Sequence, residues 1–182
     1  MRKTAVAVAV LSSIAIIAAA THASARDDGP AVPQLDDAAI VAIFDLANTA
    51  DIESGTLGAQ RAQNKEVRDY GTMLAQVHTE VRQKGRDLAK KLGVTPALPA
   101  DNTMGRDHAA AMARLGKLSG AEFDRAFLAH EEAFHKAVLD AVKGTLLPAI
   151  KNQELKDFVA SLGPAFEAHR VMAEHLAQKL AT

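Results

Sequence analysis

Four long stretches of this 182-residue chain repeat apolar side chains at intervals of three and four positions, and this spacing constrains the fold more than any other feature. It is the period of an α-helix with one buried face. Runs of β-branched residues are few, and the chain has one Tyr and no Trp. The pattern therefore predicts an all-α protein.

Capping and turn residues divide this pattern into helices. Asp36 is an expected N-cap, Ser119 with Glu122 forms an expected capping box, and Gly93 is an expected C-terminal stop. Pro164 removes a backbone hydrogen bond inside the last helix, so we expect a kink or a break there. The expected long helices cover about residues 35–62, 65–92, 120–143 and 152–180, and a short one covers about 105–117.

Short links at two of the joints predict how these helices pack. Long helices with short connections favour an up-down-up-down four-helix bundle, here with one extra short helix. An elongated coiled coil is the alternative, but the apolar pattern does not keep a strict 3.5-residue repeat. We therefore expect one bundle domain over residues 36–182.

The first 25 residues, MRKTAVAVAVLSSIAIIAAATHASA, have the features of a secretory signal peptide. A basic start precedes a short apolar run and a small-x-small pattern that ends at Ala25. We expect cleavage after Ala25, a flexible leader over residues 26–35, and a periplasmic or secreted protein. An uncleaved N-terminal anchor is the alternative.

Charge and cysteine content narrow the partners. Removing the signal takes away Arg2 and Lys3 and no acid, which leaves 19 basic and 22 acidic residues, a net charge of −3. No basic block stands out, so we expect no nucleic-acid partner, and no second apolar run predicts a membrane span. The chain has no cysteine, so it lacks disulfides and a thiolate nucleophile or ligand. The sequence does not indicate a protein partner or an oligomeric state.

Several ionisable residues fall on apolar stripes that should face the bundle interior. When their distances from the turns are counted at 1.5 Å per residue, four of these residues fall within about one and a half helical turns of the same height along the bundle axis. Glu131 precedes His135 by one turn and shares its face. The predicted inward layer contains Glu53, His78, His135 and His169.

Imidazole together with carboxylate suggests two uses for this layer. Such donors bind Zn, Fe or Cu, so Glu53, His78, His135 and His169, with Glu131 in reserve, are candidate ligands of one transition-metal ion. The alternative is a hydrogen-bonded core network without a metal or other cofactor. A buried charge on Glu53 would need a partner in either case.

Several phrases of the chain resemble the secreted bacterial family catalogued as domain of unknown function 4142. They are GTMLAQVHTEV, LSGAEFDRAFLAHEEAFHKAV and LGPAFEAHRVMAEHLAQKL, preceded by IFDLANTADIESGTLGAQRAQNKEVRDYG. The resemblance covers about residues 38–180 and implies a ferritin-like four-helix bundle. Members are often described as predicted outer-membrane proteins, but this sequence does not support outer-membrane association.

The resemblance also assigns residues. The family's inward Glu of the first helix corresponds to Glu53, and its histidines correspond to His78, His135 and His169. The family's Asp-His pair becomes Val77-His78 here, so the acid is lost. A ferritin-type di-iron centre needs two Glu-x-x-His motifs. Only Glu132-x-x-His135 is present, which favours a single-metal site.

The sequence leaves more than one function open for this protein. We expect a metal-handling or envelope-stress protein, and the resemblance alone implies the second role. The alternative is a non-catalytic structural or binding module of the envelope. A metalloenzyme would need an open coordination position, and the serines lack a convergent His/Asp pair, so we expect a binding role rather than catalysis.

Overall fold

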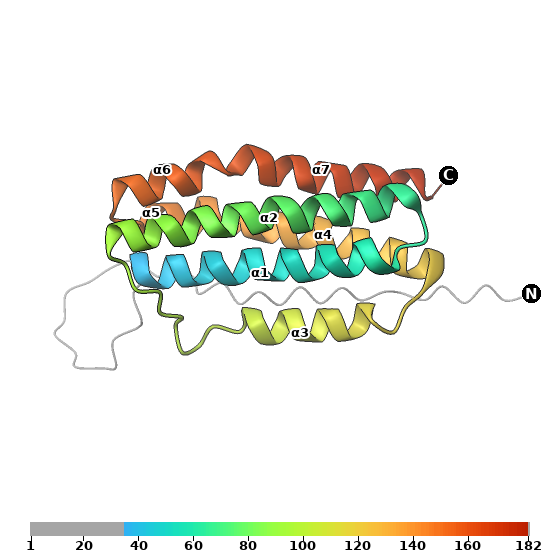
Figure 1. The fold of residues 1–182 in the computed structure, drawn as a ribbon, viewed down its shortest axis with the longest axis horizontal. Coiled ribbons are helices and arrows are strands. Elements are labelled where there is room, and N and C mark those ends of the chain that lie inside the picture. The colour runs from blue at the N-terminus through green and yellow to red at the C-terminus, as the bar shows by residue number, and fades with distance from the viewer. Residues whose placement is uncertain (1–34, 182) are drawn as a thin grey trace, which may run out of the picture.

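The protein, described by a computed structural model over residues 35–181, is a helical bundle, and among these residues no strand is found (Figure 1). The expected all-α class is confirmed. The predicted signal peptide and nearly all of the predicted leader lie outside the described residues. The elements are α1 (Asp37–Arg61), α2 (Lys65–Leu92), α3 (Met104–Leu115), α4 (Gly120–Ala141), η1 (Val142–Leu146), α5 (Leu147–Ala149), α6 (Gln153–Ser161) and α7 (Gly163–Lys179).

Four rods form the bundle in an up-down-down-up order: α1 and α7 run one way, and α2 and α4 run the other (Figure 1). This order differs from the expected up-down-up-down order, because the extra helix α3 returns the chain to the opposite end between α2 and α4. α1 and α2 lie side by side, α4 with its extension packs against α7, and α3 lies outside the four rods next to α1 (Figure 1). This is the ferritin-like arrangement with one extra short helix. No helix of the described residues is both long and apolar enough to cross a membrane.

Local sequence fixes most helix ends. The Asp36 side chain accepts a hydrogen bond from the Ala39 amide at 2.8 Å, and Gly93 ends α2 with a φ of 67°, so both predicted caps are confirmed. The predicted capping box at α4 is wrong. Ser119 is the N-cap residue, but its side chain makes no capping hydrogen bond.

The third and fourth rods are irregular. α4 passes through the π-helical turn η1 into the single turn α5. The last rod is broken at Leu162, between α6 and α7, and Pro164 lies in the first turn of α7 where a missing N–H costs nothing. The proline therefore begins a new helix rather than kinking a continuous one.

Glycines bring α1 and α2 unusually close. A Cβ on Gly71 would lie 2.6 Å from the Ala59 nitrogen and 2.7 Å from the Gly55 oxygen. A Cβ on Gly58 would lie 2.4 Å from the Phe127 ring of α4. Small residues at these positions let the backbones meet and leave room for an aromatic ring beside them.

The core has apolar layers with a polar group between them. One apolar cluster includes Leu74, Phe127 and Leu128, and another near the opposite end includes Ile40 and Ile150. Buried ionisable side chains occupy the space one helical turn from Leu74 and Leu128. The fold therefore surrounds a polar centre with apolar packing on both sides.

Candidate metal centre

Five buried ionisable residues converge from the four long rods. Their exposed fractions are 6% or less, which is rare for such side chains. All three histidine rings lie with centroids 5.2–5.6 Å apart. The set, called the central cluster below, consists of Asp51 of α1, His78 of α2, Glu131 and His135 of α4, and His169 of α7.

The first helix contributes Asp51 and not the predicted Glu53. Glu53 has a side chain that is 56% exposed, and its carboxylate pairs with His108 of α3. The prediction that Glu53 is buried is wrong, because two residues along a helix turn the side chain by about 200°. The missed signal is the row of small and polar residues that shares the face of Asp51, namely Asn48, Ser54, Gly55 and Gly58.

His78 is held in one orientation by Asn48. The Asn48 amide nitrogen donates to the Phe44 carbonyl at 2.8 Å, which leaves its oxygen to accept from His78 Nδ1 at 3.0 Å. The proton of His78 therefore belongs on Nδ1, and Nε2 carries the lone pair. Nε2 lies 3.3 Å from His169 Nδ1. Phe166 stacks on the His78 ring with centroids 5.4 Å apart.

His135 is oriented in a similar way by the backbone of its own helix. Its Nδ1 donates to the Glu131 carbonyl oxygen at 2.9 Å, so its Nε2 carries the lone pair. That Nε2 is buried without a hydrogen-bond partner. Metal-binding histidines commonly donate their second nitrogen to a carbonyl or amide oxygen, which fixes the tautomer. Both His78 and His135 meet this condition.

The two carboxyl groups are also left with unpaired oxygens. Asp51 Oδ1 and both carboxyl oxygens of Glu131 are buried without a hydrogen-bond partner. Ser54 is close enough to Glu131 to affect its pKa, but its hydroxyl donates to the Asp51 backbone oxygen at 3.3 Å. Buried polar atoms in folded proteins are nearly always paired, so a concentration of unpaired ones at one point calls for a ligand.

The unpaired carboxyl oxygens lie close to the His135 ring. Asp51 Oδ1 is 3.8 Å from the unpaired Nε2, and Glu131 Oε2 is 3.7 Å from Nδ1, the nitrogen that donates to the Glu131 carbonyl. Ligand atoms of Asp51, Glu131 and His135 all fall within 4.8 Å of each other, as do those of His78, His135 and His169. His135 is shared by the two triplets, so the geometry offers one compact centre rather than two separate ones.

Burial shifts the pKa of every member of the cluster towards its neutral form. Burial raises the pKa of Glu131 to about 8, and burial followed by the Glu131 charge raises the pKa of Asp51 well above its usual value. Burial lowers the pKa of His135 to about 4 and, with the charges of His135 and His169, that of His78 to about 2. Burial also lowers the pKa of His169.

The donor chemistry fits one divalent transition-metal ion. Two carboxylates balance the charge of such an ion, and neutral imidazole nitrogens add ligands without further charge. Asp51, Glu131 and His135 would hold the ion through the atoms that are otherwise unpaired. The cluster contains no sulfur, so the donors suit Zn, Fe(II) or Cu(II) rather than a soft monovalent ion.

Two neighbouring residues of α4 fall outside this centre. Glu132 has a side chain that is 42% exposed and lies 4.0 Å from Arg170. His130 stacks loosely on Phe134, with ring centroids 6.0 Å apart, on a different face of α4. The structure thus brings His78, His135, His169 and Glu131 together, leaves Glu53 at the surface, and adds Asp51.

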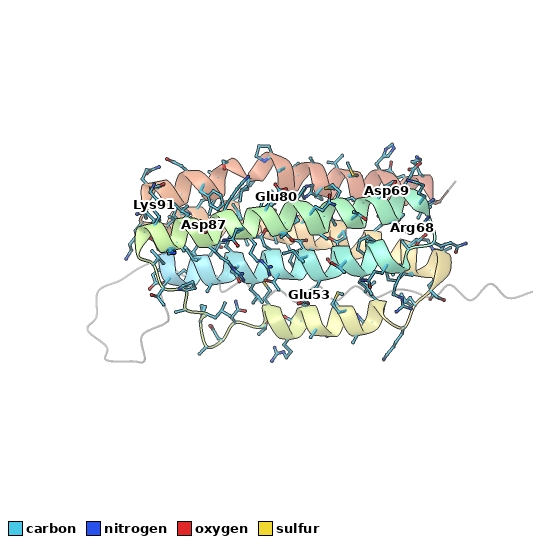
Figure 2. The ribbon with its side chains drawn as sticks, viewed as in Figure 1. Glu53, Arg68, Asp69, Glu80, Asp87 and Lys91 are labelled. Carbon is cyan, nitrogen blue, oxygen red and sulfur yellow. The ribbon has the colours of Figure 1, made fainter. Side chains whose placement is uncertain are left out.

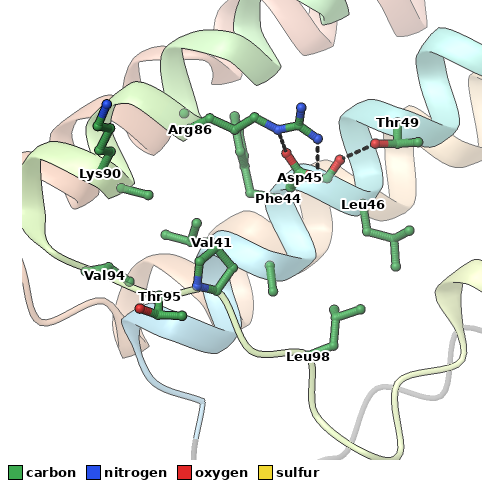
Figure 3. Close-up of a pocket in the computed structure, with 14 residues that line it drawn as sticks. Val41, Phe44, Asp45, Leu46, Thr49, Arg86, Lys90, Val94, Thr95 and Leu98 are labelled. Carbon is green, nitrogen blue, oxygen red and sulfur yellow. Dashed lines mark hydrogen bonds and ion pairs between the residues drawn. The ribbon is translucent and has the colours of Figure 1, made fainter.

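A cavity of about 590 Å³ lies elsewhere, between α1, α2 and the segment that follows Gly93 (Figure 3). Its walls are mostly apolar and include Phe44 and Leu98. Arg86 and Asp45 at its edge satisfy each other through two hydrogen bonds of 2.5 and 2.9 Å. It offers no converging set of unpaired donors, so we do not consider it a metal site.

Comparisons with known proteins agree with the fold. The profile of a family described as domain of unknown function (DUF4142) matches residues 18–176. A solved structure of a DUF305 protein from Streptomyces coelicolor, described as predicted to be secreted, is similar with a TM-score of 0.68 at 15% identity. The similarity covers 80% of this chain and 94% of that one. A search of curated proteins finds no match.

Proposed function

The chain belongs to the DUF4142 family, and on that premise we propose that it is a metal-handling protein that binds one divalent transition-metal ion in its central cluster. One observation supports this most. Asp51 Oδ1, both Glu131 carboxyl oxygens and His135 Nε2 are buried and unpaired, and ligand atoms of these three residues lie within 4.8 Å of one another. Each unpaired buried polar atom costs about 1–3 kcal/mol of stability, so together these atoms would cost several kcal/mol. A bound ion that pairs with them would remove this cost.

The ligand set divides into an inner and a supporting part. Asp51, Glu131 and His135 hold the ion, since their unpaired atoms have no other use. His78 and His169 complete the centre from α2 and α7. Asn48 accepts a hydrogen bond from His78 Nδ1–H, and this keeps the lone pair on His78 Nε2 directed towards the centre. Removing a supporting partner of this kind typically changes metal affinity 10–100-fold.

The second candidate function is a non-catalytic module of the envelope, whose buried polar side chains hydrogen-bond to one another without a metal. The hydrogen bond between His78 Nε2 and His169 Nδ1 favours it, because that pair is satisfied without a metal. Asp51, Glu131 and His135, in contrast, keep buried polar atoms that have no hydrogen-bond partner. The two candidates therefore make different predictions for metal affinity on that side.

Equilibrium metal binding by the purified protein tests the proposal. After chelator treatment, titration with Zn²⁺, Fe²⁺ and Cu²⁺ should show one tight equivalent for at least one ion. Asp51→Asn, Glu131→Gln and His135→Gln should each weaken it by more than about 100-fold, which exceeds the effect of losing a supporting partner. Glu132→Gln, one residue along the same helix, is the matched control and should bind as the wild type does. Absence of a tight equivalent would support the structural module instead.

Secretion is part of the same proposal. The signal-peptide features of residues 1–25 support export with cleavage after Ala25. Mass spectrometry of the protein from its natural host should then find Arg26 as the first residue. A chain that begins at Met1 in the cell envelope would contradict cleavage and favour an anchor.

A further inference from the structure

A second group of polar side chains lies between α3 and the bundle, beside the central cluster. Glu53 of α1 lies on the side of the bundle where α3 packs (Figure 2). Its Oε2 atom is 2.8 Å from Nε2 of His108 on α3. The Glu53 side chain is 56% exposed and that of His108 is 10% exposed. The pair thus has one end in solvent and the other beneath α3.

His108 carries an unpaired atom that the ion pair does not explain. Its Nδ1 is buried without a hydrogen-bond partner. If the pair served only to attach α3, the Glu53 contact to Nε2 would be sufficient and a residue with a single polar group would do. With Nε2–H donating to the Glu53 carboxylate, the imidazole keeps one lone pair, on the buried Nδ1, that can bind a cation in transit.

His130 continues this group towards the central cluster. Its ring centroid lies 6.0 Å from that of Phe134, which in turn lies 6.3 Å from that of His135. Helix α3, which carries His108, packs against α4, and after burial the charge of His108 is the next cause of the lowered pKa of His130. The charge of His130 is also among those that lower the pKa of His135, after burial and the charge of His169. Glu53 and His108 thus form the outer pair of this group, and His130 is separated from His135 by one aromatic ring, that of Phe134.

α3 is the element that can expose this group. Only Ala111 and Leu115 of α3 are buried, and its N-cap residue makes no side-chain capping bond. Its C-terminal end is held by Arg61, which donates to the Gly116 and Leu118 carbonyls at 2.7 and 2.9 Å. His108 lies near the opposite, N-terminal end. Elements with few buried contacts open locally before the rest of a fold does.

We propose that Glu53, His108 and His130 form an outer capture site through which divalent transition-metal ions enter and leave the central cluster when the N-terminal end of α3 moves away from α1. The inference rests on the proposed function. A fully buried centre needs such a route, and these residues are donors of the right chemistry on the side of the bundle that the sparsely buried helix α3 covers.

The kinetics of metal uptake test this route. Stopped-flow mixing with Zn²⁺ or Co²⁺ gives the loading rate, and transfer to excess chelator gives the release rate. Glu53→Gln keeps an acceptor for His108 but removes the charge, and should slow loading about tenfold, as expected when an attracting charge is lost. Release should slow by a similar factor, so the dissociation constant stays near that of the wild type. Glu80→Gln, which changes another exposed carboxylate, on α2, is the matched control.

A reversible cross-link tests the movement of α3 separately. A Cβ at Gly105 would lie 4.0 Å from Leu46 Cδ1 of α1, and the chain contains no cysteine. The double variant Leu46→Cys, Gly105→Cys, closed with a short thiol cross-linker that reducing agent cleaves, should load slowly when closed and at the wild-type rate when opened. Each single variant controls for the substitution itself.

The outcomes separate the two proposals. If the wild type binds one ion tightly but Glu53→Gln and the closed cross-link load at unchanged rates, the capture route is wrong and the central site stands. Slowed loading in His175→Ala, which is exposed on α7 across the bundle, would place the entrance on the opposite side and also overturn the route. If the wild type binds no ion, both proposals fail.

Discussion

The stability of the metal-free protein should fall as pH rises from 6.5 to 8, because Glu131 must then ionise in a dry site. Burial raises the pKa of Glu131 from 4.5 to about 8 in the folded chain. Over this interval the folded state binds more protons than the unfolded state, so the free energy of unfolding decreases with pH. The stability linked to protonated Glu131 is fully present below pH 4.5, and it is lost as the pH rises through 8.

The magnitude follows from the same shift. A change of one pKa unit corresponds to 1.36 kcal/mol, so the whole shift is worth about 5 kcal/mol and the interval from pH 6.5 to 8 about 2 kcal/mol. The raised pKa of Asp51 adds a loss of the same sign. The histidines do not contribute here, because their lowered pKa values reduce stability only as pH falls below 6.5.

Urea unfolding in chelator at half-unit steps from pH 6.5 to 8.5 measures this slope. Glu131→Gln cannot ionise and removes one cause of the raised Asp51 pKa, so its slope should be less than half that of the wild type. Glu132→Gln, with a half-exposed side chain, should keep the wild-type slope. A wild-type stability that stays flat over this interval, or an equal slope in Glu131→Gln, would refute a dry, protonated Glu131.

Three further predictions follow from the structure. Metal binding at pH 7 should release at least one proton, since Glu131 with a pKa of about 8 must lose its own; calorimetry in buffers of different ionisation enthalpy measures the number, and a value of zero would contradict Glu131 as a ligand. Gly71→Ala should destabilise the protein by about 1–3 kcal/mol, because its Cβ would meet the α1 backbone at 2.6 Å, whereas Gly144→Ala, which meets nothing within 4 Å, should be neutral or stabilising; equal effects in urea unfolding would argue against the close α1–α2 approach. Asp124→Ala should cost about 2–4 kcal/mol, since the buried carboxylate accepts from the Gln63 and Asn64 amides at 2.8 Å each; a loss below about 0.5 kcal/mol in the same assay would contradict that role.

Periodicity predicted the bundle because helices with one buried face leave a strong pattern. The helix ends at Asp36 and Gly93 could be predicted because capping depends on nearby residues alone. The break at Leu162 rather than a kink could not, because it depends on how α6 and α7 each pack against their neighbours.

The site was predictable on three of the four rods. His78, His135 and His169 fall on apolar stripes that leave little choice of face. On α1 several faces are apolar, since Ile40, Ile43, Phe44 and Ala50 surround the helix, so the stripe through Glu53 was as plausible as the stripe through Asp51. Helix α3 covers the Glu53 face, and the position of a short helix after a long loop depends on tertiary contacts that sequence spacing does not contain.

Anomalous diffraction from crystals of the protein loaded with one equivalent of metal would test the central claim most directly. The expected result is a single strong peak at the metal edge among Asp51 Oδ1, the Glu131 carboxylate and His135 Nε2. A peak confined to surface residues, or a central cluster that holds only water at full loading, would contradict it.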